Sequence, residues 1–444
     1  MEVEVKQSTL IQLTLPIFLE LLLMTVVGNI DIIMVSKFSD KGVGVLGGMS
    51  QILYTQSVIF SFISIGTGIL ISQYIGAKKQ EKIFEVIGVS LLLNIIISLI
   101  LGIIYWYFAH DILAKIKLSE ELISIGINYF RVVGGICIFQ AVTVTASSAL
   151  RSFGYAKIPL YINVLINLIN ILMNGMFLFG WMGAPILGVT GVGIATIFSR
   201  MIGFIIALSV LKKYCKFSFS LKKYKKFPTD ILKYILQIGV PSGAEHLFWN
   251  LAQITILSMV NTMGIVNITA RTYLNLIAVF IMMFSIALGQ GTAILNARSI
   301  GAKKLKEAYH ECLKSLKLSL ILVSVLLILL LIFQNSILEF FTKDKEILKI
   351  AKRVIWIFLF VETGRTFNII IINSLHAAGD VKFPMLAGIF CMFGIAVTLS
   401  YILGIKMNMM LIGIWIANGT DEWVRGILML KRWNSLIWTR KGFV

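Results

Sequence analysis

Carboxylates stand inside sequence that is otherwise apolar. Glu20 and Asp31 interrupt the run from Leu10 to Val35 and are eleven residues apart. At 100° per residue, eleven residues make three helical turns, so both side chains leave one face, about 16 Å apart along the axis. A carboxylate facing lipid is costly, so this face should look into the protein. There, a carboxylate can bind a proton or balance an organic cation.

Asparagines form a polar stripe in a later apolar run. The steps of four, three and four between Asn163, Asn167, Asn170 and Asn174 place all four on one helix face. For Asn163 and Asn167 we favour hydrogen bonding between helices. Asn170 and Asn174 also suit a hard cation or a partner carboxylate. If this stripe meets the face with Glu20, the first half contains a polar pocket.

The second half carries charged residues of its own. Glu245 follows Pro241 as Glu20 follows Pro16. Two further runs contain acids beside arginines, and two interpretations stay open for them: buried structural ion pairs at helical spacing, or a charged cavity wall. The acids and bases concerned are Glu362 with Arg365, and Asp421 and Glu422 with Arg425. Our candidates for the wall of a substrate cavity are Glu20, Glu245, Trp249, Glu362 and Asp421.

An internal repeat relates the two halves. Nine of the fifteen positions 65–79 are identical at 290–304, an offset of 225 residues. The same offset relates residues 16 and 20 to 241 and 245, and it relates residues 150, 154, 157 and 159 to 375, 379, 382 and 384. The chain is therefore a duplicated half-molecule, which is the usual build of a secondary transporter.

The composition indicates that the chain resides in a membrane. Hydrophobic residues make up 58% and charged residues 14% of the 444 residues, and the mean hydropathy is +0.91. Four scattered cysteines give neither a disulfide scaffold nor a zinc site. Runs long enough to span a bilayer fall at 10–35, 45–72, 85–108, 122–150, 158–180, 188–211, 233–259, 270–297, 312–334, 350–375, 383–404 and 411–430.

These runs predict an all-α integral membrane protein with twelve transmembrane helices. With six helices in each lobe, both repeats enter the bilayer in the same direction, so a pseudo-two-fold axis along the membrane normal relates them. We predict a first lobe at 1–211, a cytoplasmic linker at 212–232, a second lobe at 233–432 and a cytoplasmic tail at 433–444.

The excess of 40 Lys+Arg over 21 Asp+Glu gathers after even-numbered spans. The positive-inside rule then places both termini and the linker in the cytoplasm. The basic stretch at 222–226 favours contact with anionic lipid headgroups over nucleic acid. No nucleotide-binding, nucleophile-elbow or zinc-protease motif occurs, so we expect no enzyme and no cofactor. Energy must then come from an ion gradient or from the gradient of the substrate.

The repeat, the Gly-Ala-Lys-Lys turns at 76–79 and 301–304, and the Leu-x-x-x-Gly-x-x-Lys-x-Pro links at 150–159 and 375–384 resemble the multidrug and toxic compound extrusion (MATE) family. So do residues 29–35 and 241–245. The resemblance implies two six-helix lobes around a central cavity. It also implies export of amphipathic or cationic drugs by rocker-switch antiport with H⁺ or Na⁺.

The resemblance also implies site residues. Asp31 is similar to the first-span aspartate that binds the coupling ion, with Asn170, Asn174 and Thr196 as its partners. Asn174 stands at a position that is commonly aspartate, which favours a proton at Asp31 at least as much as Na⁺. Glu245 resembles a seventh-span acid, whereas the sodium-coupled branch has its acid where this chain has Trp249.

We therefore expect a monomeric exporter in the cytoplasmic (inner) membrane of a prokaryote, with lipids and small cationic or amphipathic substrates as partners. The alternative is a flippase for lipid-linked precursors, whose cavity would be strongly cationic. A membrane enzyme would need a cluster of His, Cys or Asp at one membrane face, and a channel would need a re-entrant filter. The sequence favours neither of them.

Overall fold

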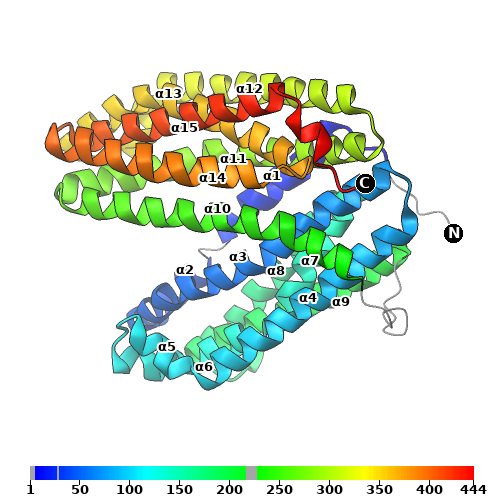
Figure 1. The fold of residues 1–444 in the computed structure, drawn as a ribbon. Coiled ribbons are helices and arrows are strands. Elements are labelled where there is room, and N and C mark those ends of the chain that lie inside the picture. The colour runs from blue at the N-terminus through cyan, green and yellow to red at the C-terminus, as the bar shows by residue number, and fades with distance from the viewer. Residues whose placement is uncertain (1–5, 28–29, 217–227) are drawn as a thin grey trace. The chain divides into compact units, whose positions relative to one another are not determined.

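The computed structural model describes residues 6–27, 30–216 and 228–444. These residues form helices and turns, with no strand among them, so the all-α prediction is confirmed. They divide into two compact units, Met1–Gly239 and Val240–Val444. Figure 1 shows the helices coloured along the chain.

In the first unit, α3 packs against α4, α6 and α7, while α8 packs against α9 and α1. The helices of this unit are α1 (Leu10–Val27), α2 (Ile30–Ser36), α3 (Asp40–Gly76), α4 (Gln80–Tyr107), α5 (Ala109–Lys115), α6 (Glu120–Gly135), α7 (Ile138–Ser152), α8 (Lys157–Phe179) and α9 (Gly188–Cys215).

In the second unit, α13 packs against α11, α12 and α15 and so occupies the centre. Asp344 caps α13, because its carboxylate accepts hydrogen bonds from the backbone N–H groups of Glu346 and Ile347. The boundary between the units falls inside α10. The helices are α10 (Thr229–Asn261), α11 (Ile265–Gly301), α12 (Leu305–Phe341), α13 (Lys345–Ala377), α14 (Lys382–Cys391) and α15 (Met410–Asn434).

Helices cover all twelve predicted spans. Nine stretches in the described part of the chain are long and apolar enough to cross a membrane, or ten if α6 and α7 count as one bent span. The other two spans are α10 and α15, which carry Glu245 and Asp421.

The first predicted span comprises α1 and α2, with residues 28–29 outside the described part. Two other predicted spans are not continuous α-helices. The fourth bends by 41° between α6 and α7, beside the pair Gly134 and Gly135, because glycine weakens a helix. The eleventh continues from α14 into π-helical segments at Met392–Val397 and Ser400–Lys406.

Two glycine turns related by the repeat each contact a segment near one terminus. Gly154 and Gly379, which are 225 residues apart, both have a left-handed backbone, with φ of 92° and 83°. A Cβ atom on Gly154 would lie 2.5 Å from the carbonyl oxygen of Lys6, and one on Gly379 would lie 2.7 Å from that of Lys441. Each terminal segment therefore packs closely on the glycine turn of its own unit.

The predicted linker and tail are partly helical. α9 continues to Cys215 and α10 begins at Thr229, while residues 217–227 of the linker lie outside the described part. Within the tail, the Trp433 and Trp438 rings stack with their centroids 4.1 Å apart, and both side chains are buried.

Candidate functional site

Asp31 lies at the start of α2 and faces the asparagine stripe of α8. Nδ2 of Asn174 donates a hydrogen bond of 2.6 Å to Oδ1 of Asp31 and also lies 3.2 Å from Oδ1 of Asn170. Asn170 in turn donates to the hydroxyl of Thr196 on α9, at 3.3 Å. The structure therefore brings all four predicted ion-site residues of the first unit into one connected cluster.

Two residues that the sequence analysis did not select complete this cluster. Arg200, one turn after Thr196 on α9, and Tyr129 on α6 both interact electrostatically with Asp31. Oδ1 of Asn174 is buried and has no hydrogen-bond partner. The cluster thus contains one carboxylate, one guanidinium and an amide oxygen that remains free to accept a hydrogen bond. The 225-residue offset could have pointed to Arg200, because Arg425 is its counterpart.

Glu20 occupies a second polar cluster, further toward the amino end of α1. Asn163 donates a hydrogen bond of 2.6 Å to its Oε1, and the guanidinium of Arg151 on α7 lies 3.5 Å from the same atom. Glu20 and Asp31 therefore both face α8, as their spacing predicted. Glu20 therefore forms a buried ion pair with Arg151 and accepts a hydrogen bond from Asn163. Its surroundings do not identify a substrate.

In the second unit, α13 and α15 share a buried network of charges. Arg365 lies 2.7 Å from Glu362 on its own helix and 3.3 Å from Glu422 on α15. Asn368, also on α13, donates a hydrogen bond of 3.0 Å to Glu422. The predicted ion pair between Glu362 and Arg365 is present, and Arg365 also links α13 to α15.

Arg425 anchors the α15 side of this network. Its guanidinium lies 2.7 Å from Asp421 and 3.1 Å from Glu422. The side chains of Arg425 and Asp421 are each only 5% exposed. Together with Arg365 and Glu362, the network holds three carboxylates and two guanidinium groups. The network therefore contains the buried ion pairs that one of the two interpretations predicted. It also contains one carboxylate more than its guanidinium groups can neutralise.

Glu245 lies on α10, apart from the ion pairs of that network. Oε2 of Glu245 is 3.5 Å from Nε2 of His376 on α13, and the two side chains are 13% and 11% exposed. Arg425 acts on Glu245 electrostatically. Trp249, one turn further along α10, is half-buried. The sequence analysis missed His376, although the repeat pairs it with Arg151.

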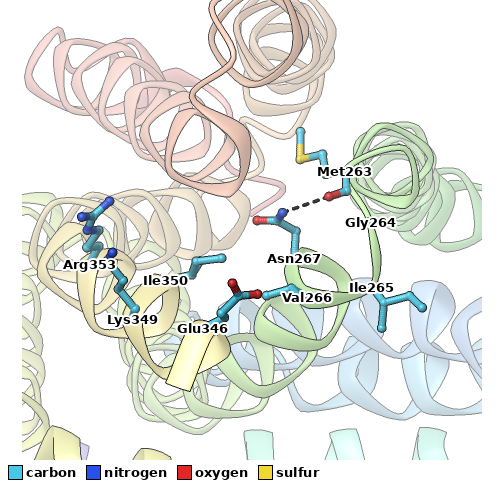
Figure 2. A pocket seen from close by; sticks show the side chains of 9 residues that line it. All are labelled: Met263, Gly264, Ile265, Val266, Asn267, Glu346, Lys349, Ile350 and Arg353. Atoms are coloured by element: carbon cyan, nitrogen blue, oxygen red, sulfur yellow. Dashed lines mark hydrogen bonds between the residues drawn. The ribbon is translucent and has the colours of Figure 1, made fainter. Parts of the chain in front are cut away.

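The described residues contain no group of three or more His, Cys, Asp or Glu side chains that could hold a metal ion. A hollow of about 480 Å³ opens elsewhere in the second unit, between the turn that joins α10 to α11 and the first turns of α13 (Figure 2). None of the predicted site residues lines it. Its lining residues are Met263, Gly264, Ile265, Val266, Asn267, Glu346, Lys349, Ile350 and Arg353.

Comparison with known proteins agrees with this architecture. The family model MatE matches residues 16–176 and again residues 241–402, once in each half. "Uncharacterized transporter YisQ" of Bacillus subtilis is 39% identical over 98% of this chain and 96% of its own length. "Probable multidrug resistance protein YoeA" of the same species is 28% identical over 90% and 88%.

Solved structures share the fold. A crystal structure described as MATE in the bent conformation has a TM-score of 0.88 at 19% identity, covering 96% of this chain and 95% of that one. A Vibrio cholerae MATE transporter also has a TM-score of 0.88, at 16% identity, covering 97% of this chain and 98% of that one. These likenesses bear on the fold alone.

Proposed function

The chain belongs to the MatE family of multi-pass membrane transporters, and from this premise we propose that it exports small cationic or amphipathic compounds in exchange for protons. The name of one relative, a probable multidrug resistance protein, supports this substrate class. We place the transporter as a monomer in the cytoplasmic membrane of a bacterium, with both termini inside.

The observation that carries the choice of the proton is the contact between Asp31 and Asn174. A sodium site collects several oxygen ligands, whereas Asn174 presents its N–H group to the carboxylate. Arg200 adds a positive charge nearby, which opposes a second cation. A single carboxylate, in contrast, needs no further ligand to take up one proton.

Exchange then follows from competition at Asp31. The ionised carboxylate attracts a cationic substrate, and the protonated one does not, so uptake of a proton from outside weakens binding of the cargo. By linkage, the cargo must weaken proton binding by the same factor. We propose that a rocker-switch motion of the lobes presents this site to each side of the membrane in turn.

A flippase for lipid-linked pyrophosphates is less compatible with these charges. In the described part of the second unit, the buried network and its neighbour Glu245 contain four carboxylates but only two guanidinium groups. Such a surface repels a pyrophosphate and attracts a cation.

The test is efflux of ethidium from proteoliposomes under an imposed pH gradient or an imposed sodium gradient. The proposal expects the pH gradient to drive efflux, and expects Asp31→Asn to lower the rate by about tenfold or more, the equivalent of one charge-assisted hydrogen bond. Asp111→Asn, at an exposed acid on α5, is the matched control. Efflux driven only by sodium, or undiminished in Asp31→Asn, would contradict the proposal.

A further inference from the structure

The duplicated chain builds the same ion pair twice, with one change. Glu20 and Arg151 in the first unit correspond, at the offset of 225, to Glu245 and His376 in the second. The separation between acid and base is 3.5 Å in both pairs. Each base is also placed alike, because Arg151 and His376 both lie in the last turn of their helix.

A third position distinguishes the two copies. Asn163, which donates the hydrogen bond of 2.6 Å to Glu20, corresponds to Gly388 in the second unit. A Cβ atom on Gly388 would lie 3.7 Å from Cγ and 3.9 Å from Oε1 of Glu245, which is ordinary contact. The second carboxylate therefore lacks the carboxamide donor that the first has, and Gly388 places no side chain against it.

The change of base alters the chemistry. A guanidinium stays protonated at every pH at which a protein functions, so Arg151 is a permanent counter-ion. Imidazole is the side chain whose ordinary titration falls in the physiological range. Nε2 of His376 is buried, makes no hydrogen bond and lies 3.5 Å from Oε2 of Glu245, so a proton on this nitrogen would complete an ion pair like that of Arg151.

Other charged groups near the pair do not replace this function. His246 on α10 and Arg425 on α15 act on Glu245 electrostatically. α14 contributes Gly388, beside which lies the methyl group of Met392 from the following π-helical segment. Arg425 is already in contact with Asp421 and Glu422. Among these described groups and His376 on α13, it is His376 that lies within ion-pair distance of Glu245.

We propose that Glu245 and His376 form a second, proton-controlled cation site in the carboxyl-terminal unit. A proton on Nε2 makes an imidazolium that occupies Glu245 as Arg151 occupies Glu20. Loss of that proton releases the carboxylate, which then binds the positively charged nitrogen or phosphonium centre of an organic cation, without the competing amide donor that Glu20 has. This inference rests on the proposed exchange of protons for cations, and it assigns the proton in this unit to His376.

The experiment measures binding of tetraphenylphosphonium to the protein in lipid nanodiscs between pH 5.5 and 8.5. An Asp31→Asn background removes the site of the first unit. We expect the affinity to rise about tenfold or more with pH while His376 is present, to stay high at every pH in His376→Gln, and to stay low in His376→Arg. His310→Gln, at the exposed histidine of α12, should keep the parent profile. A pH-dependent affinity that survives in His376→Gln would overturn the proposal.

Gly388 supplies a second pair of variants. Gly388→Asn rebuilds the amide donor of the first unit and should weaken binding at high pH by about tenfold. Gly388→Ala adds a methyl group at ordinary contact distance and no donor, and should not weaken binding. Equal effects of the two variants would contradict the role given to the missing amide donor.

A spectroscopic arm separates this inference from the proposed function. The chain has only four histidines, so the ring signals of protein labelled with ¹³C-histidine can be assigned with His376→Gln. The His376 signal should change with pH, and Glu245→Gln should alter that change while Glu20→Gln does not. If tetraphenylphosphonium binds with the expected pH dependence but no pH gradient drives ethidium efflux, the proposed function fails and the inference stands. A His376 signal that does not respond to pH, or that responds alike in Glu245→Gln, overturns the inference.

Discussion

Asn174 donates a hydrogen bond of 2.6 Å to Asp31, and the same bond recurs eleven residues earlier in the first span and on α8. There Asn163 donates to Glu20, again at 2.6 Å, and both pairs join residues 143 apart in the sequence. The first span (α1 and α2) and α8 therefore run alongside each other, and matched asparagines on α8 hold two carboxylates. The surroundings distinguish them, because Glu20 has a contacting arginine and Asp31 has a network of amides and a hydroxyl.

A second carboxylate in the first unit should change the ion that the transporter uses. In Asn174→Asp, two carboxylates would lie within hydrogen-bond distance, and like charges so close need a proton or a metal cation between them. We expect an imposed sodium gradient to drive ethidium efflux by this variant. Asn163→Asp, which adds its charge beside Arg151 instead, should not respond to sodium. Indifference of Asn174→Asp to sodium would show that the cluster cannot form such a site.

The charge network of the second unit should be indispensable for stability. Arg425→Met leaves Asp421 and Glu422 buried without their closest counter-ion, and breaking a buried pair in this way costs about 3–5 kcal/mol. The melting temperature in detergent should fall clearly, and adding Asp421→Asn should recover part of the loss. Lys431→Met, at an exposed position of α15, is the control. An Arg425→Met protein that melts like the parent would refute this account.

The glycine turns should hold the ends of the chain in place. Alanine at Gly379 meets both a left-handed backbone and a contact of 2.7 Å with the carbonyl oxygen of Lys441. Strain of this kind costs about 1–3 kcal/mol, so we expect faster proteolysis of the carboxyl-terminal tail. Gly183→Ala separates the two effects, since Gly183 has φ of 78° but open space around it. Equal protease sensitivity of the two variants would assign the effect to backbone strain alone.

Topology can be tested by labelling single cysteines. All four native cysteines are buried, so their background reaction with a membrane-impermeant maleimide should be low. We expect Met182→Cys, in the 93% exposed position between α8 and α9, to react from outside intact cells. Lys79→Cys, between α3 and α4, should react only after the membrane is opened. Labelling of both positions from the same side would contradict the predicted orientation.

Much of this architecture was predictable from the sequence because its signals are local and periodic. Apolar runs of sufficient length identified every span, and the steps between the asparagines placed them on one face. The ends of helices were less predictable: α3 spans Asp40–Gly76, although its apolar run covers only 45–72. A helix continues as long as its backbone hydrogen bonds can form, whether or not its residues are apolar. Hydropathy therefore does not detect the polar turns at its ends.

The partners in the sites were the least predictable part. His376 meets Glu245, and Arg200 lies near Asp31, only because helices distant in the sequence pack together. No local pattern marks either base, since each lies in an ordinary helical turn. The offset of 225 residues could have found both bases. It had to be applied to polar residues that differ between the copies, such as Arg151 and His376.

The wide turns after Cys391 make the two halves unequal in a way that aligned sequences conceal. A π-helical turn closes its hydrogen bond one residue later than an α-helical turn, so Met392–Val397 and Ser400–Lys406 take more residues per turn than their counterparts on α8. Ile395 and Leu399, the counterparts of Asn170 and Asn174, are apolar. The asparagine pair of the first ion site therefore has no equivalent at these two positions of the second unit.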